Sequence, residues 1–246
     1  MEADRVYGYR NLMGDLNQEG MLKPYGYLKL LNQLVEEHFE VLGLSQNKAM
    51  EHRLAWILIS AVFLIIRPVR GTGRVFGSTW YSGRDGISFR REFVFRDEEG
   101  VLLFKGSCFS VLMNLEERSI FREQCVPFGL PEPLEVLMAV AEPSRRIHGD
   151  FEGVEEWQVR NSQLDLLGHV NNIRYLEFAY DALNGEERRR FCQEGRLEIY
   201  FQAELNPGEG VELLKGLVGD EVLIRGIRKS DGRVSFDCAF SSSEAW

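Results

Sequence analysis

The sequence predicts an α+β protein in which one structural unit occurs twice, each copy a long central helix wrapped by an antiparallel β-sheet. A long amphipathic segment is followed by several strand-like runs, and the same order returns in the second half of the chain. Glycine and aspartate mark the turns in both halves, and prolines gather between the halves. A helix and a sheet that each carry one apolar face are stable when they bury those faces together.

The first copy begins with a helix over Tyr25–Leu42, where Leu28, Leu31 and other apolar residues recur at helical spacing and Gly43 is a typical stop. The next segment is rich in isoleucine and ends before a proline, which favours one long strand over Ala55–Arg67. Further strand-like runs cover Arg74–Tyr81, Gly86–Arg96 and Val101–Leu115.

The second copy begins with a helix over Val170–Leu183. Its strand-like runs cover Leu197–Leu205, Gly210–Val218, Glu221–Arg228 and Arg233–Ser241. We therefore expect an N-terminal unit over residues 1–126, a linker over residues 127–144 and a C-terminal unit over residues 145–246. The linker carries the prolines Pro127, Pro131, Pro133 and Pro143.

Composition agrees with a soluble intracellular enzyme but does not by itself choose one. The four cysteines are widely separated, with no Cys-x-x-Cys pair, so we expect free thiols in a reducing cytoplasm. The first residues resemble neither a secretory signal nor a transit peptide, and the longest apolar run, Leu54–Ile66, is too short to cross a bilayer. A net charge of -9 and the lack of a basic motif argue against nucleic acid as a partner.

One polar stretch has the residues for acid/base chemistry. His169 follows Gly168 and precedes an apolar helical pattern, while Asp165 lies four residues earlier across a short turn. The partial positive charge of a helix N-terminus favours neutral imidazole, and Asp165 is placed to hold one ring nitrogen. The alternative is that Asp165 and Asn171 only cap the turn, with His169 packed at its edge.

This stretch, Asp-x-x-Gly-His-Val-Asn-Asn-x-x-Tyr-x-Glu, resembles the signature of the acyl-ACP thioesterases, which release fatty acids from acyl carrier protein. The resemblance covers about Arg5 to Ser241. Further landmarks follow in the same order: Trp56-Ile57-Leu58, Arg67-Pro68, Thr79-Trp80, Arg90-Arg91-Glu92-Phe93 and Leu197-Glu198-Ile199-Tyr200. The resemblance implies a tandem, or double, hot-dog fold, which agrees with the repeat.

The resemblance also implies site residues. The family's catalytic Asp, His and further acid match Asp165, His169 and Glu204, with Asn171 as a substrate contact, whereas the family's Asn two residues before the His is replaced by Leu167. The position after Glu204, a cysteine in some relatives, is Leu205, which argues against a cysteine nucleophile. The first copy has no histidine in its matching segment from Asp15 to Gly20, so we expect the second copy to be the catalytic one.

The roles of these residues follow from their chemistry. Glu204 would act as general base on a water, with His169 and Asp165 sharing or orienting the proton, and backbone N–H groups near Gly168 and His169 would hold the oxyanion. No metal or organic cofactor is required. Strand alternation places Glu204 on one face with Glu198, Tyr200 and Gln202, a pattern that also fits a plain solvent-facing row.

Two more sets of residues are candidates for substrate binding. In the family the first hot-dog supplies the acyl-chain pocket, which implies that Trp56 and Trp80 line a tunnel, although either is also an ordinary core residue. Eight arginines against two acids between Arg53 and Arg96 give this segment a charge of +6. Arg84 and Arg90 would then contact an acidic carrier or its phosphate, unless these arginines only guard sheet edges.

Three functions remain open at this stage. The first is hydrolysis of fatty acyl-acyl carrier protein, the second is hydrolysis of acyl-CoA, and the third is a weakly active or non-catalytic acyl-binding protein, suggested by Leu167. A monomer and a homodimer fit the sequence equally well.

Overall fold

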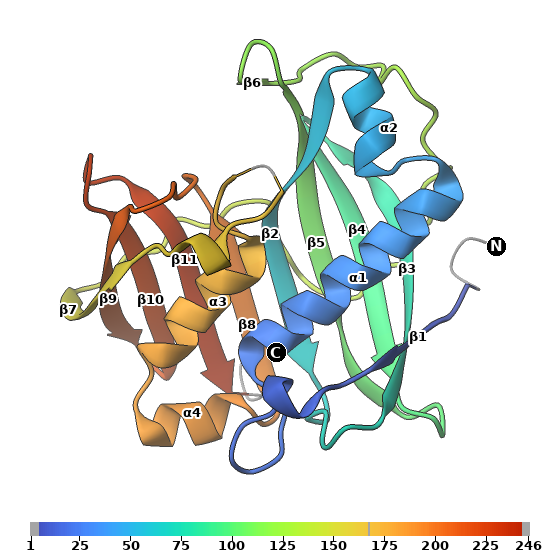
Figure 1. Ribbon diagram of the computed structural model, residues 1–246. Coiled ribbons are helices and arrows are strands. Elements are labelled where there is room, and N and C mark those ends of the chain that lie inside the picture. Colours follow the sequence, from blue (N-terminus) through green and yellow to red (C-terminus); the bar gives the residue numbers. More distant parts are fainter. Residues whose placement is uncertain (1–4, 167, 243–246) are drawn as a thin grey trace.

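The computed structural model describes residues 5–166 and 168–242, whose strands form one antiparallel sheet (Figure 1). The first half holds β1 (Tyr7–Arg10), α1 (Pro24–Leu42), α2 (Gln46–Glu51), β2 (Leu54–Ile65), β3 (Arg74–Asp85), β4 (Ser88–Arg96), β5 (Leu102–Asn114) and β6 (Ser119–Ile120). The second half holds β7 (Phe151–Gln158), α3 (Asn172–Asp181), α4 (Gly185–Phe191), β8 (Gly195–Phe201), β9 (Gly210–Val218), β10 (Glu221–Arg228) and β11 (Val234–Ser242).

The strand order shows an internal two-fold repeat. It runs β1-β3-β4-β5-β2-β8-β11-β10-β9-β7, with the short β6 paired to β5, so each half reads the same from its outer edge to the centre. The halves join where β2 pairs antiparallel with β8, from Ser60 opposite Tyr200 to Ile65 opposite Gly195. The predicted α+β double hot-dog is confirmed, while the boundaries at 126/127 and 144/145 stay predictions.

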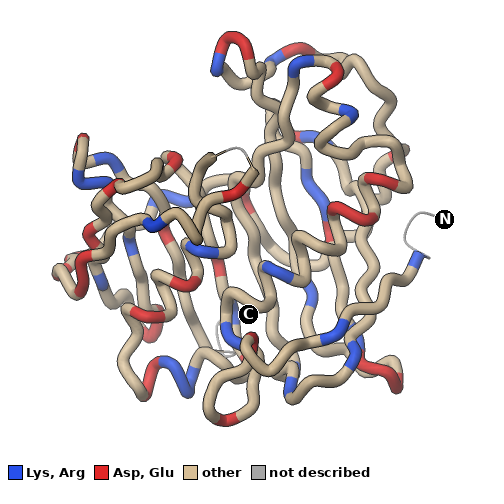
Figure 2. The backbone as a smooth tube through the Cα atoms, viewed as in Figure 1, with Lys and Arg blue, Asp and Glu red and all other residues tan. Residues whose placement is uncertain are grey.

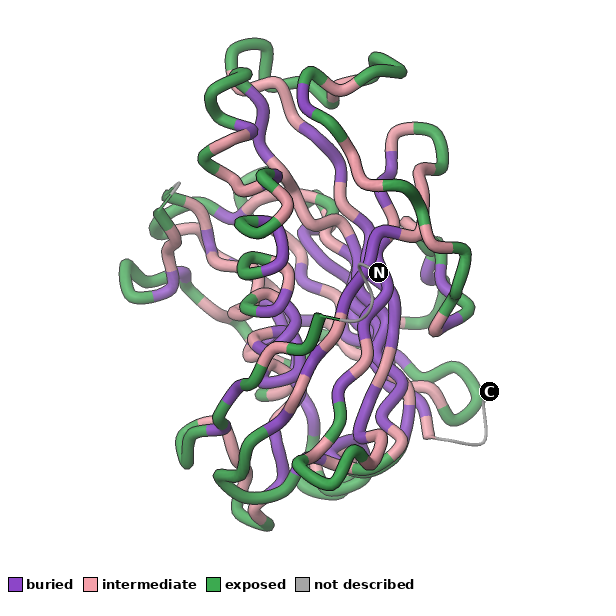
Figure 3. The backbone as a smooth tube through the Cα atoms, turned by 90° about the vertical axis from the view of Figure 1, so that its right-hand side faces the viewer, coloured by how far each residue is buried: buried purple, intermediate pink, exposed green. Residues whose placement is uncertain are grey.

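Each half lays one helix across its sheet, and the two helices touch (Figure 1). On α1 the side chains Leu28, Leu31 and Leu34 are fully buried, and Gly43 ends the helix in a left-handed conformation with φ of 68°. Helix α3 is shorter than predicted, because Val170 is still extended and bonded to Leu205, and the side chain of Asn171 caps the helix. Figure 3 shows buried residues concentrated between the helices and the sheet.

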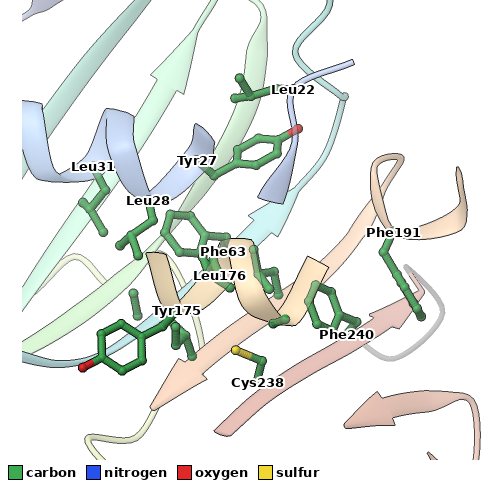
Figure 4. Packing of buried hydrophobic residues seen from close by; sticks show 14 of the residues in the cluster. Leu22, Tyr27, Leu28, Leu31, Phe63, Tyr175, Leu176, Phe191, Cys238 and Phe240 are labelled. Atoms are coloured by element: carbon green, nitrogen blue, oxygen red, sulfur yellow. The ribbon is translucent and has the colours of Figure 1, made fainter. Parts of the chain in front are cut away.

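One hydrophobic core runs through both halves. Phe63 of β2 packs against the aromatic rings of Tyr27 and Phe93, and the same cluster includes Tyr175 and Leu176 of α3. In the close view, Phe63 lies between Leu28 of α1 and Leu176 of α3 (Figure 4). The core therefore fixes the two halves relative to each other, which matters for a site that uses residues of both.

The linker begins on the helix side of the sheet, where Phe128 packs against Trp56, and from Leu134 on it crosses the opposite face. Its backbone is held by side chains on that face: Trp80 donates to the carbonyl of Val136 at 3.0 Å, and the Glu92 carboxylate accepts from the Met138 N–H at 2.7 Å. Trp80 and Glu92 are cross-strand partners, whereas their neighbours Thr79 and Phe93 face the helix side. Both faces of the sheet are thus covered around its centre.

Candidate active site

The turn before α3 is built around Asp165 and His169. The Asp165 N–H donates to the His169 carbonyl at 2.8 Å, and the Asp165 carboxylate accepts from the His169 N–H at 3.2 Å. Gly168 has φ of 81°, a left-handed conformation that suits glycine, and its N–H donates to the Asp165 carbonyl. The turn directs the His169 side chain to the surface, where 26% of it is exposed.

The structure corrects one expectation about this turn. The N–H groups of Gly168 and His169 were expected to hold an oxyanion, but both already donate to Asp165. Asn171 is the helix cap, with its Oδ1 accepting from the Ile173 N–H at 3.0 Å. Leu167, the departure from the family pattern, lies outside the described residues.

Glu204 is held beside His169 by the segment that follows β8. The predicted strand through Leu205 is wrong at its end: β8 stops at Phe201, and the N–H groups of Gln202 and Ala203 both donate to the carbonyl of Ser235. Strand alternation therefore does not reach Glu204.

Three contacts then fix the Glu204 backbone. Arg228 donates to the Glu204 carbonyl at 2.9 Å, the Leu205 N–H donates to the Tyr175 hydroxyl at 3.2 Å, and the Leu205 carbonyl accepts from Val170. Burial raises the pKa of Tyr175 to about 12, so its hydroxyl stays protonated as a structural group.

The side chains of His169 and Glu204 meet at the surface. His169 Nε2 lies 3.4 Å from Glu204 Oε2, and Glu204 is 41% exposed. The same oxygen lies 3.6 Å from Nη2 of Arg118, a residue of the β5–β6 hairpin in the first half. Sequence reasoning did not find Arg118, because no local pattern links it to a residue 86 positions later. Within the described chain, no three His, Cys, Asp or Glu side chains gather as a metal site.

Trp56 lines a small apolar cavity at the end of α1. Its indole N–H donates to the Leu44 carbonyl at 2.9 Å, and its ring packs edge-on against Phe89. The cavity holds about 10 Å³, which is room for one water molecule at most. Its other lining residues are Phe39, Leu44, Tyr81, Arg91, Ser110, Leu130 and Pro131.

A buried charged group stands at this cavity. The Arg91 guanidinium lies over the Phe39 ring and meets Nδ1 of His38 at 2.6 Å, and both side chains are almost fully buried. Burial, with Arg91 and Arg5 nearby, lowers the pKa of His38 to about 4, so the imidazole is neutral and accepts from the guanidinium.

Two predicted substrate contacts lie elsewhere. Trp80 is buried against the linker on the opposite face from Trp56, so it lines no tunnel with it. Arg90 is only 18% exposed and donates to Glu92, to Ser107 and to the linker carbonyl of Ala139. The buried carboxylate of Glu92 needs a charged partner, which Arg90 supplies. The guanidinium of Arg90 is thus engaged by Glu92 and by the linker.

Arg84 is partly exposed at the end of β3. It donates to the carbonyls of Gly86 and Gln124 and stacks on Phe89. Along the backbone of the first half, Lys and Arg positions lie among Asp and Glu positions (Figure 2). Of the eight arginines counted along the sequence, Arg91 is buried and Arg90 is only 18% exposed, so they do not all lie at the surface.

Comparison with known proteins assigns the chain to a family. The model of the acyl-ACP thioesterase N-terminal domain matches residues 4–124, and that of the C-terminal domain matches residues 150–241. The chain belongs to the acyl-ACP thioesterase family. It is therefore a thioester hydrolase, and its substrate class is fatty acyl-acyl carrier protein. No curated protein matched the sequence.

Solved structures agree on the fold. An acyl-ACP thioesterase from Bacteroides thetaiotaomicron is similar at a TM-score of 0.82 and 18% identity, over 96% of both chains. The 12:0-ACP thioesterase from Umbellularia californica is similar at a TM-score of 0.79 and 13% identity, again over 96% of both chains. In the described part of this acyl-ACP thioesterase, no helix has the length and hydropathy to span a membrane.

Proposed function

We propose that this thioesterase releases free fatty acid from acyl carrier protein with Glu204 as general base and His169 as its partner, thereby ending chain elongation. The observation that carries the proposal is the 3.4 Å approach of His169 Nε2 to Glu204 Oε2 at the surface, on backbone segments fixed by hydrogen bonds. The Glu204 side chain is 41% exposed, so a water can reach its carboxylate. Asp165 supports the site by holding the turn that carries His169.

The reaction then needs one water and no further reactant. Glu204 takes a proton from the water while the water oxygen attacks the thioester carbon. The carbonyl π electrons then move onto the carbonyl oxygen. When that oxyanion re-forms the C=O bond, the C–S bond breaks. The proton on Glu204 passes through the His169 imidazole to the leaving sulfur, giving a fatty acid and the carrier thiol.

The acyl chain would enter the apolar region around Trp56. Because the cavity there holds only about 10 Å³, side chains such as Phe39, Phe89 and Leu130 must move when the chain enters. The apolar lining matches an alkyl chain, and the depth that opens would set the preferred chain length.

The carrier and the assembly state belong to the proposal as well. Arg84, which keeps part of its guanidinium exposed, remains a candidate contact for the acidic carrier protein. Acyl-CoA is the alternative carrier, and both a monomer and a homodimer remain compatible with the site. Free Cys108, Cys125, Cys192 and Cys238 fit the cytoplasm that we expect.

The test is thiol release by purified protein from acyl-ACP and from acyl-CoA of equal chain length, compared with Glu204→Gln. We expect kcat/KM to be higher for acyl-ACP, and Glu204→Gln to lower kcat at least about 100-fold, because the amide accepts no proton. Thermal denaturation of both proteins controls for folding. Thioester hydrolysis that is unaffected by Glu204→Gln would refute the role of Glu204, and acyl binding without hydrolysis would favour a binding protein.

A further inference from the structure

Arg118 lies at the catalytic pair although it belongs to the other half. It ends the loop of the β5–β6 hairpin, and its Nη2 lies 3.6 Å from Glu204 Oε2. Its side chain is 70% exposed and makes no other hydrogen bond or ion pair with described residues. Most of its N–H donors therefore face solvent beside the oxygen that also meets His169.

The backbone of Arg118 is unusual for its residue type. It has φ of 51°, in the left-handed region that glycine or asparagine occupies in most hairpin loops. The loop is otherwise well formed, since Asn114 accepts from the N–H groups of Glu116 and Glu117. Local turn preference does not account for an arginine here, and non-glycine residues in this region often belong to functional sites.

The backbone donors that the sequence suggests for the thioester oxygen are already used among the described residues. The N–H groups of Gly168 and His169 are occupied by Asp165, and the family's amide side chain is replaced by Leu167. Hydrolysis of a thioester places a full negative charge on the carbonyl oxygen, and a donor aimed at that oxygen is usually a large part of catalysis.

We propose that Arg118 is a catalytic residue contributed by the first half, whose guanidinium donates hydrogen bonds to the oxyanion of the tetrahedral intermediate. Before the reaction it pairs with the Glu204 carboxylate. As Glu204 takes the proton from water it becomes neutral, and one negative charge appears on the substrate oxygen beside it. The guanidinium then binds the transition state more strongly than the ground state, which is the condition for catalysis. This inference rests on the proposed function of Glu204.

The experiment is to replace Arg118 by glycine, which fits φ of 51° and removes the whole side chain, guanidinium included. We expect kcat for acyl-ACP to fall about 100-fold with KM changed less than about threefold, and thermal stability to be equal or higher. Added methylguanidinium should restore part of kcat, a rescue that a structural role does not give. The matched control is Arg53→Gly: Arg53 is also 70% exposed and has φ of 58°, but it pairs with Glu116 at 2.6 Å. We expect its kcat to match the wild type.

The outcomes separate this inference from the proposed function. If Glu204→Gln abolishes hydrolysis while Arg118→Gly keeps wild-type kcat, Arg118 has no catalytic role and the base assignment stands. A rise in KM alone after Arg118→Gly would place the guanidinium on the carrier and also overturn the inference. If Glu204→Gln retains activity, the proposed function itself fails.

Discussion

The two halves build the same turn, and only one of them equips it for catalysis. In the second half Asp165 donates to the His169 carbonyl and accepts from the His169 N–H; in the first half Asn17 makes both bonds with Met21, at 2.8 and 2.9 Å. The residue after each turn also makes the same hydrogen bond: the Leu22 N–H donates to the Val69 carbonyl, and the Val170 N–H donates to the Leu205 carbonyl. The geometry of the turn is therefore a property of the repeat, and the chemistry depends on which side chains occupy it.

The tyrosine below each turn completes the comparison. Tyr27 accepts from the Val69 N–H and Tyr175 accepts from the Leu205 N–H. Pro68 precedes Val69 just as Glu204 precedes Leu205. The first half thus has Asn17, Met21 and Pro68 at the three positions that hold Asp165, His169 and Glu204 in the second half. It contributes instead the apolar cavity near Trp56 and the Arg118 hairpin.

The repeat also corrects an expectation from the sequence. The sequence matches the segment Asp15–Gly20 to the turn that begins at Asp165, but the hydrogen bonds pair Asn17 with Asp165 and Asp15 with Gln163. Asp15 serves a different purpose, an ion pair with Lys29 at 2.8 Å.

The largest expected effect comes from making the second half resemble the first. His169→Met introduces the residue that Met21 shows the turn accepts, so folding should persist while kcat falls about 100-fold or more through loss of the imidazole. The reciprocal Met21→His should leave kcat unchanged, because Pro68 supplies no carboxylate there. Steady-state kinetics and thermal denaturation measure both. A His169→Met protein with near-normal kcat would break the comparison.

The next effect is on stability and concerns the first half alone. Burial keeps the folded-state pKa of His38 at about 4, below the value of about 6.5 in an unfolded chain. Above pH 6.5 both states are neutral at this residue; between pH 6.5 and 4 only the unfolded state binds the proton, so stability falls over that window. We expect a loss of about 2 kcal/mol from pH 7 to pH 5 at this residue.

Urea unfolding at the two pH values measures this loss. His38→Gln keeps an acceptor for Arg91 but does not titrate, so its stability should fall by less over the same interval. An equal fall in both proteins would assign the pH dependence to other groups.

A smaller effect tests the charge of Asp165. The amide of Asn17 makes the same backbone bond in the first half, so Asp165→Asn should keep the turn and the thermal stability. We expect kcat to fall about tenfold, because the negative charge near the imidazole is lost. An unchanged kcat would reduce Asp165 to the capping role that was the alternative from the sequence.

The sequence was most informative where structure is local. The strands Gly210–Val218 and Glu221–Arg228 were predicted with their true ends, because Gly219 and Asp220 form the turn between them. The turn at Asp165 and His169 was also recognisable, since its residues are neighbours in the chain.

The parts that failed depend on distant residues. β8 ends at Phe201 because Ser235, on another strand, takes up the next two N–H groups, and nothing in the alternation of Leu197–Leu205 records that. Arginine is usually a surface residue, yet Arg90 is covered by the linker. Arg118 reaches Glu204 only because β2 and β8 join the two halves of the sheet. The pairing of His169 with Glu204 came from the family resemblance and was not visible in their spacing.

The smallest effect distinguishes the two tyrosines. Tyr27→Phe and Tyr175→Phe each leave a buried N–H without its acceptor, so each should lower the free energy of unfolding by about 1 kcal/mol. The two should differ in activity. Leu205 is next to Glu204, so loss of the Tyr175 hydroxyl loosens the segment that carries the base, and kcat should fall about threefold. Val69 is next to Pro68, and Tyr27→Phe should leave kcat unchanged. Equal kcat losses in the two variants would mean that activity follows the stability of the whole sheet and not the position of Glu204.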